Sequence, residues 1–210
     1  DMGYIAYPSQ DGSVYVTGAY MSIVDFDNGI QADIRTAQER DIYLLKLDSE
    51  GNYEWVYTAG GSNWDYGNWI EPIGNSVYFG GAFRNVVEFD PNSSETTSSI
   101  GGVDSFMAKL STDGNFEWVK TIGGISDDYV WFTRNTEGNF VGGGWFKQSC
   151  DFDPSSGVNM ITSNGNADAL ICEYDISFSP IWVKNIGGTG PEYGQGIVVD
   201  GNNNCYLSGL

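Results

Sequence analysis

The chain has 210 residues, 40% of them apolar and 15% aromatic, which is enough for a buried core and excludes wholesale disorder. Its 28 acidic and nine basic side chains give a formal net charge of −19, which argues against nucleic acid as a partner, because phosphate binding needs clustered Lys and Arg. The chain has no histidine, which excludes a Ser-His-Asp or Cys-His catalytic arrangement and a histidine-ligated zinc or iron site.

Four short strands are expected in each of several successive segments. In the first segment they lie before the Gly12-Ser13 turn, over residues 14–18, over 42–47 and around Trp55. The 29 glycines, the six prolines and the short runs rich in Val, Tyr, Phe and Trp predict tight turns between strands and almost no helix. In the third segment the last turn, at residues 176–180, has lost its Asp-Gly or Gly-Asn pair.

A tandem repeat underlies this order. The stretch Phe116–Gly124 has a counterpart 63 residues earlier, Tyr53–Gly61, and a shorter one 64 residues later, at 182–188. An acidic residue followed by tyrosine comes four residues after each Gly-Gly pair. We therefore expect one domain over residues 1–210, divided into units 1–59, 60–122 and 123–186 and a partial unit 187–210, and we expect the chain to begin and end inside a repeat.

This pattern predicts an all-β protein, a β-propeller of four-stranded antiparallel blades with a repeat of about 63 residues. The segment 42–47 is apolar on both faces, as expected for a sheet packed between neighbouring sheets. A β-sandwich is the alternative, although it should show cleaner alternation. Three blades and a partial one are fewer than the four to eight of a closed propeller, so the chain is expected to be part of a larger one.

The motifs Gly-Gly followed by Asp-Tyr, Val-Asp-Phe-Asp-Pro, Asp-x-Phe-x-x-Lys-Leu and Gly-Asn-Phe-x-Trp-Val-Lys resemble the bacterial β-propeller repeat called SBBP, over essentially the whole chain. The resemblance implies a module located outside the cell, in large secreted or cell-surface proteins of Bacteroidota. Such proteins often leave the cell through the type IX secretion system. The sorting domain of that system and any targeting segment are expected outside this chain. The family has no established catalytic residues to carry over.

Closely spaced carboxylates recur once in each full unit. They are Asp25 and Asp27, Glu88 and Asp90, and Asp151 and Asp153. In one hypothesis the aromatic residue between them anchors the strand end while the carboxylates accept backbone N–H bonds in the following turn. In the other, they bind calcium through oxygen ligands, joined by loop carbonyls and by Asp41, Asp104 or Asp168. No EF-hand-like sequence is present.

Three further sets of residues recur at fixed positions. Asp65, Asp128 and Glu192 follow Gly-Gly and are expected to accept hydrogen bonds from the amides of the crossing between units. Trp55, Trp118 and Trp182 are predicted to be buried between blades rather than to stack on sugars. Cys150, Cys172 and Cys205 fall at apolar strand positions and are predicted to be small core residues.

These observations favour a non-catalytic extracellular scaffold or adhesion module. The alternative is a ligand-binding or enzymatic propeller acting on polysaccharide, but paired carboxylates that recur in every unit suit a structural role better than an asymmetric active site. The long connections at residues 28–40, 91–103 and 154–167 are expected to contact a partner protein, a glycan or another part of the parent protein. The strongest departures from the repeat are at 31–40 and 131–134.

No apolar run approaches the roughly 18 residues that span a bilayer, so membrane insertion is not expected.

Overall fold

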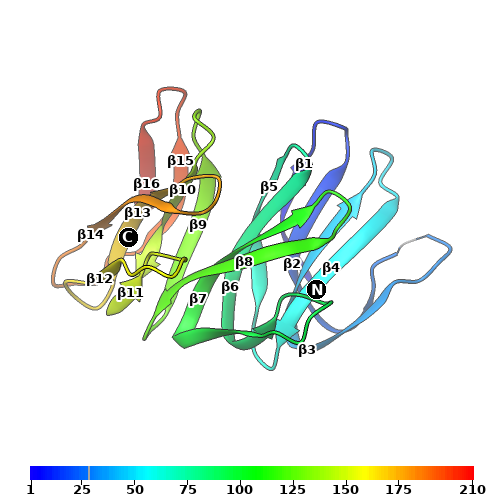
Figure 1. Cartoon of the computed structure of the whole chain (residues 1–210), viewed down its shortest axis with the longest axis horizontal. Helices are drawn as coiled ribbons and strands as arrows, with labels where there is room; N and C mark the ends of the chain where they lie inside the picture. The colour runs from blue at the N-terminus through cyan, green and yellow to red at the C-terminus, as the bar shows by residue number, and fades with distance from the viewer. Residues whose placement is uncertain (28) are drawn as a thin grey trace. The chain divides into compact units, whose positions relative to one another are not determined.

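Figure 1 shows a computed structural model of the chain, which describes residues 1–27 and 29–210. Every regular element of the described residues is a β-strand, and the paired strands run antiparallel. The predicted all-β, antiparallel class is therefore confirmed. No helix in the described ranges is long and apolar enough to cross a membrane. Asn28, the first residue of the first expected long connection, lies outside the described residues.

Repeat 1 is a meander of four strands paired in chain order. They are β1 (Met2–Pro8), β2 (Val14–Asp25), β3 (Ile34–Leu47) and β4 (Tyr53–Gly61). Tyr7 pairs with Tyr15, Tyr15 with Lys46, and Lys46 with Trp55. One row of side chains therefore crosses all four strands on the same face of the sheet.

Repeat 2 has the same four strands about 63 residues later. They are β5 (Tyr66–Ile73), β6 (Ser76–Glu88), β7 (Thr97–Ser111) and β8 (Phe116–Gly124). Gly60 and Gly61, at the end of β4, pair with Glu88 and Val87, at the end of β6. The Gly-Gly pair is therefore the last part of a strand that continues into the next repeat, and not a turn between repeats.

Repeat 3 forms a separate four-stranded sheet, and repeat 4 is a hairpin. The sheet contains β9 (Asp128–Arg134), β10 (Phe140–Phe146), β13 (Asp168–Tyr174) and β14 (Pro180–Ile186), and the hairpin contains β15 (Gly194–Val199) and β16 (Cys205–Gly209). Two short strands, β11 (Ser149–Asp151) and β12 (Met160–Thr162), lie between β10 and β13. Gly123 and Gly124 pair with Asp151 and Cys150 of β11, which repeats the junction between repeats 1 and 2.

The long connections are shorter than the sequence predicted. β3 already begins at Ile34 and β7 at Thr97, and β12 lies inside the third connection. The reason is that the second and third strands of each repeat stay paired beyond the body of the sheet, for example Ile23 with Thr36. Each long connection is therefore the tip of a hairpin arm, formed by the ends of the second and third strands.

The tight turns between other strands share one hydrogen-bond pattern, except the two-residue turn at Gly74 and Asn75 between β5 and β6, where Ile73 pairs directly with Ser76. In repeat 2 the Ser111 amide donates to the Asn115 carbonyl, at 2.9 Å, and the Gly114 amide donates to the Ser111 carbonyl, at 3.0 Å. Gly114 has a φ of 81°, in the left-handed region where glycine has no steric cost. The predicted tight turns are thus confirmed, with glycine at the position that requires a positive φ.

Phe178 replaces this glycine in repeat 3, where the sequence indicated a degenerate turn. The same two backbone hydrogen bonds form, from Asp175 to Ser179 and from Phe178 to Asp175, and Phe178 has a φ of 58°. Its fully buried ring stacks on Tyr174, with the centroids 4.5 Å apart. Burial of this ring offsets the backbone strain of a non-glycine residue in the left-handed region.

The chain divides into two compact units, Asp1–Ser98 with Phe106–Val119, and Ser99–Ser105 with Lys120–Leu210. In the first unit, the main core lies between the sheets of repeats 1 and 2. Repeat 1 contributes Tyr15, Leu44 and Tyr57 from one face of its sheet, which we call face B. Repeat 2 contributes residues of its opposite face, face A, including Phe79 and Ala108.

Face A of repeat 1 carries a second, smaller cluster. Tyr43 and Leu45 of β3 belong to it, whereas their neighbours Ile42 and Leu44 point to the opposite face and into the main core. This explains why residues 42–47 are apolar in both positions of the alternation.

In the second unit, Cys150 and Cys172 are fully buried free thiols, as predicted. Burial raises the pKa of Cys172 to about 12, so this thiol stays neutral. Cys205 is only half-buried, which differs from the prediction because β16 has a sheet neighbour on one side only. Gly143 of β10 lies on the face of the repeat 3 sheet opposite Cys172. A Cβ at Gly143 would meet Ile197 and Leu207, so this face packs closely on the hairpin of repeat 4.

Candidate functional site

The aromatic residue of each Asp-Phe-Asp motif lies in the protein interior. Phe89 is 1% exposed and packs on Phe106, with ring centroids 5.0 Å apart, and Phe152 is 0% exposed and packs on Phe146 at 5.2 Å. Phe26 is half-buried against Tyr43. The aromatic residue therefore anchors the end of the second strand, as the structural hypothesis expected.

The carboxylates of the motif hold the hairpin arm that follows. Asp151 Oδ1 accepts the amides of Asp153 and Asn159, at 3.0 and 2.8 Å, and Asp153 Oδ1 accepts the Ser155 amide at 2.9 Å. The Ser155 hydroxyl, which donates to Asp153 Oδ1 at 2.6 Å, and the Ser155 amide together hold the pKa of Asp153 below its usual range.

In repeat 1 the same geometry recurs. Asp25 Oδ1 accepts the amides of Asp27 and Asp33, and Asp27 Oδ1 accepts the Gly29 amide.

Repeat 2 departs from this arrangement. Asp90 accepts the Asn92 amide at 2.9 Å, but the residue equivalent to Asp151 is Glu88, which is exposed on β6. Glu88 therefore stands where the other two repeats have an aspartate whose Oδ1 accepts two backbone amides of the arm. The sequence prediction that the three pairs are equivalent is therefore supported by geometry at two of them.

Calcium would have to share these carboxylates with backbone amides. Among the described residues no three His, Cys, Asp or Glu side chains gather in a way that could hold a metal ion. Asp41 does not join Asp25, because it pairs with Tyr20, five residues before Asp25 and about 16 Å away along β2 at the usual rise per residue. A calcium ion near this motif would therefore rely on one or two carboxylates, carbonyl oxygens and water.

Asp41, Asp104 and Asp168 instead face the first glycine of each Gly-Gly pair. A Cβ built on Gly60, Gly123 or Gly187 would come well under 3.0 Å from the carboxyl group of the corresponding aspartate. Only glycine therefore fits beside this acid. The first glycine of the repeat signature is required by a close approach, and not by backbone conformation.

The acids that follow Gly-Gly accept backbone amides, as predicted. Asp65 accepts the amides of Gly61, at 3.1 Å, and Arg84, at 2.9 Å, and Glu192 accepts the Gly188 amide at 2.9 Å. Asp128 accepts the Lys147 amide at 3.2 Å, which is the bond equivalent to that of Asp65 with Arg84. Asp65 and Asp128 therefore connect the start of repeats 2 and 3 to the end of the second strand of the same repeat.

Burial raises the pKa of four of these carboxyl groups. Desolvation raises the pKa of Asp41 to about 6 and the pKa values of Asp65, Asp104 and Asp128 to about 7, although backbone amides that donate to them oppose the shift. One oxygen each of Asp41, Asp104 and Asp128 accepts no hydrogen bond from the described residues. A neutral carboxyl group suits this environment better than an ionised one.

A row of Tyr, Lys and Trp crosses face B in repeats 1 and 2, and sequence analysis did not predict it. Lys46 forms an ion pair with Glu54 at 2.7 Å and lies 5.7 Å from the ring of Tyr15. Lys109 of repeat 2 repeats this arrangement with Glu117 and Tyr78. The signal in the sequence was a lysine recurring inside an apolar strand.

Repeat 3 reverses the charge of this row. Glu173 takes the place of the lysine and accepts the indole N–H of Trp182 at 2.6 Å. It also accepts hydrogen bonds from Asn135 and Asn139, each at 2.8 Å. The substitution therefore keeps a fully partnered row while removing its positive charge.

The three tryptophans occupy equivalent strand positions, as predicted, but they are half-buried rather than buried. Trp55 lies at the rim of the core, where its indole N–H donates to the Thr112 carbonyl at 3.0 Å. Its ring also covers Gly114, where a Cβ would come within 3.0 Å of it. Trp55 therefore links repeat 1 to a turn of repeat 2, as the packing hypothesis expected, but from the edge of the core.

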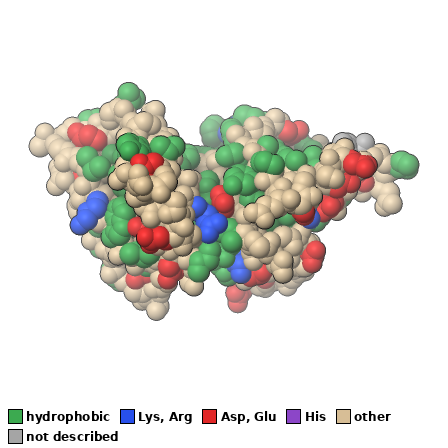
Figure 2. All heavy atoms as spheres, turned by 90° about the horizontal axis from the view of Figure 1, so that it is seen from above, with side chains coloured by type: hydrophobic (Ala, Val, Ile, Leu, Met, Phe, Trp, Pro, Cys, Tyr) green, Lys and Arg blue, Asp and Glu red, His purple; other side chains and the backbone are tan. Residues whose placement is uncertain are grey.

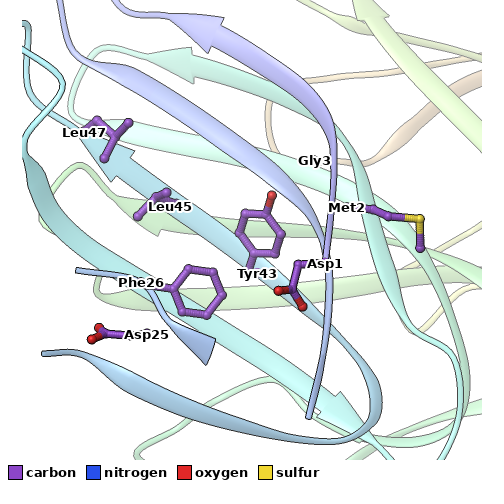
Figure 3. Close-up of a pocket in the computed structure, with 8 residues that line it drawn as sticks. All are labelled: Asp1, Met2, Gly3, Asp25, Phe26, Tyr43, Leu45 and Leu47. Carbon is purple, nitrogen blue, oxygen red and sulfur yellow. The ribbon is translucent and has the colours of Figure 1, made fainter. Parts of the chain in front are cut away.

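Three pockets lie beside the Asp-Phe-Asp motifs. One of 410 Å³ in the first unit contains Asp90, Glu95 and Glu117, and one of 190 Å³ in the second unit contains Asp151 and Asp153. The third has a volume of 310 Å³ and lies on face A of repeat 1, where Figure 3 shows Phe26 beside Tyr43. Figure 2 shows acidic side chains spread over one surface of the molecule in small groups, with few basic ones between them.

Comparison with known proteins adds no assignment to this geometry. No protein-family model matches the chain, and no curated protein matches it either.

Proposed function

We propose that the chain is a segment of a larger β-propeller of SBBP-like repeats, which acts outside the cell or on its surface as a non-catalytic scaffold or adhesion module. Successive four-stranded meanders with a constant offset support the propeller architecture. The apolar residues on both faces of repeat 1 support it further, since a propeller blade packs between two neighbours. Export by the type IX system is part of the same proposal and rests on the resemblance of the repeat.

Exposed apolar side chains on the hairpin arms carry the functional part of the proposal. Ile34 is 61% exposed, Ile100 57%, Val158 74% and Met160 55%. Such side chains, on arms that differ in sequence from repeat to repeat, are suited to contact a partner protein or a glycan.

The repeated positions of the carboxyl groups argue against catalysis by this chain. Asp65 and Asp128 hold equivalent backbone amides in successive repeats, and Asp25 and Asp151 do the same in the hairpin arms. A catalytic pair needs two carboxyl groups in different environments at one place, whereas these positions repeat with the fold.

The arms can be tested directly by the double variant Val158→Asp with Met160→Asp. We expect it to lose binding to a glycan array or to immobilised bacterial surface protein, while its melting temperature stays close to that of the unaltered chain. Ile181→Asp is the matched control, because Ile181 is 52% exposed on β14, outside the arms. Equal loss of binding in both variants, or release of reducing sugar ends from a polysaccharide by the purified chain, would contradict the proposal.

A further inference from the structure

The 410 Å³ pocket lies on repeat 2, between its hairpin arm and the beginning of β8. All of its lining residues belong to the first compact unit. They include Phe116 and Trp118 together with three acidic residues, Asp90, Glu95 and Glu117, and no lysine or arginine is among the described residues that line it. Aromatic and acidic residues therefore meet in one pocket.

Repeat 1 holds a guanidinium group between its own arm and the beginning of β4. Arg35 donates from Nε to Asp33 Oδ1 at 2.6 Å and from Nη2 to Asp33 Oδ2 at 3.0 Å. The Tyr53 hydroxyl, at the first position of β4, also donates to Asp33 Oδ2. The ion pair is partly buried, with 40% of the Arg35 side chain and 27% of the Asp33 side chain exposed. A bidentate ion pair thus links arm and strand in repeat 1.

Repeat 2 has lost all three groups of this contact. At the offset of 63 residues, the aspartate, the arginine and the tyrosine are replaced by Thr96, Ser98 and Phe116. Thr96 and Phe116 line the 410 Å³ pocket. A carboxylate has been gained beside them, because Glu95 stands where repeat 1 has Ala32. The pocket therefore lies where repeat 1 holds its arginine, and it has acidic residues without that cation.

Two of the acids in the pocket can accept further hydrogen bonds. Asp90 accepts one backbone amide through Oδ1, at 2.9 Å, which leaves Oδ2 for a ligand. The side chain of Glu95 is exposed, while its backbone amide donates to Ser93 Oγ at 3.0 Å and fixes the residue on the arm. Glu117 already forms an ion pair with Lys109 at 2.7 Å. Asp90 and Glu95 are therefore the acceptors for an additional cation.

An arginine side chain matches this pocket better than a lysine side chain or an anion. The net charge of −19 attracts cations and repels anions. A guanidinium group is planar, donates two parallel hydrogen bonds to a carboxylate and stacks on aromatic rings, whereas an ammonium group is a compact and strongly hydrated charge. Phe116 and Trp118 supply aromatic residues beside the two acids.

We propose that this pocket binds the guanidinium group of an arginine side chain from a partner protein, in the position that Arg35 has in repeat 1. Asp90 and Glu95 accept its N–H groups, and Phe116 contacts its plane. The inference rests on the proposed function only in that a partner reaches a hairpin arm, and it names the group that the arm of repeat 2 recognises.

A titration of the full chain with N-acetyl-arginine amide, followed by NMR at low salt, tests this directly. We expect saturable shifts of the backbone amide signals of Thr96, Thr97 and Val119, which line the pocket. N-acetyl-citrulline amide has the same shape without the charge, and N-acetyl-lysine amide has the charge without the planar fork, so both should bind more weakly.

Two variants and a control connect this binding to the pocket. Glu95→Gln should weaken binding about fivefold, whereas Glu50→Gln, the same change of charge at an exposed turn of repeat 1, should leave it unchanged. Ser98→Arg with Thr96→Asp rebuilds the ion pair of repeat 1, so its own guanidinium group should fill the pocket and binding should be lost. Both positions are exposed, so the fold should tolerate the two changes.

Absence of shifts with the arginine derivative overturns the proposal, as does equal affinity for the citrulline or the lysine derivative. Binding that persists in Ser98→Arg with Thr96→Asp overturns it as well. Val158→Asp with Met160→Asp should bind the arginine derivative as the unaltered chain does, so failure of the proposed function and failure of this inference are separate results.

Discussion

The carboxyl group of Asp104 lies directly against the α-carbon of Gly123, so close that a Cβ on this glycine would overlap it. Asp104 is 1% exposed and its Oδ2 accepts the Ile100 amide at 2.8 Å. The same contact recurs between Asp41 and Gly60 and between Asp168 and Gly187. It couples the third strand of each repeat to the Gly-Gly end of the fourth.

We predict that Gly123→Ala destabilises the protein by about 2–3 kcal/mol, because the added methyl group must displace a buried acid. Chemical unfolding of the variant measures the loss. Gly201→Ala is the control, since a Cβ at Gly201 meets no atom within 4 Å and should change the free energy of unfolding little. Equal stability of both variants would show that Asp104 moves aside without cost.

The buried acids should make the protein more stable in mild acid. Asp104 has a pKa raised to about 7, against an ordinary value of 3.8, so its neutral form is favoured in the folded state. The stabilisation is fully present below pH 3.8 and is lost as the pH rises to about 7, at about 1.4 kcal/mol per pH unit for one such carboxyl group. Asp65 and Asp128 should contribute with the same sign.

The variant Asp104→Asn tests this by removing one ionisable group while keeping an acceptor oxygen for the Ile100 amide. Unfolding measured between pH 4 and pH 8 should show a shallower loss of stability than in the unaltered chain. Asp113→Asn, at an exposed turn position, should leave the slope as it is. A slope that is the same in Asp104→Asn and the unaltered chain would mean that Asp104 ionises without cost.

Asp151 should stabilise its hairpin arm without any metal. We expect Asp151→Ala to lower the free energy of unfolding by about 1–2 kcal/mol in the presence of a chelator, because the amides of Asp153 and Asn159 lose their acceptor. Glu88→Ala, at the equivalent but exposed position of repeat 2, should be nearly neutral. Similar losses in both variants would refute a special role for the short carboxylate.

Calcium remains the metal that we predict for the Asp-Phe-Asp motifs, since only oxygen ligands are available there. Excess calcium should raise the melting temperature relative to excess chelator, and Asp153→Asn should reduce that rise. Magnesium at the same concentration serves as the comparison. An unchanged midpoint in calcium would leave the motif with its hydrogen-bonding role alone.

Trp55 should contribute less to the free energy of unfolding than a fully buried tryptophan. Trp55→Phe removes the hydrogen bond to Thr112 but retains a ring over Gly114, so we expect a loss of about 1 kcal/mol, rising to about 2–3 kcal/mol in Trp55→Ala. Trp64→Ala is the control, because Trp64 is 63% exposed. A loss above that range in Trp55→Ala, measured by chemical unfolding, would show that the rim position is as important as the core.

The sequence by itself determined the repeat, the four strands of each unit and the tight turns. These features depend on residues close together in the chain, such as Gly114 in its turn and the alternation around Leu44 and Leu45, and such local preferences leave a direct pattern in the sequence. The Gly-Gly pair was visible for the same reason, although its cause was not.

Only the tertiary structure determined how these elements pair and pack and which side chains they bring into contact. The pairing of Gly61 with Val87 extended strands into segments that read as loops, and the position of Trp55 at the rim of the core left it half-buried. The close approach of Asp104 to Gly123, the row of Lys46 with Tyr15 and Trp55, and the pocket between Glu95 and Phe116 all depend on residues brought together from different strands or repeats. Such contacts have no local period, so only the folded chain shows which side chains meet and where a pocket remains.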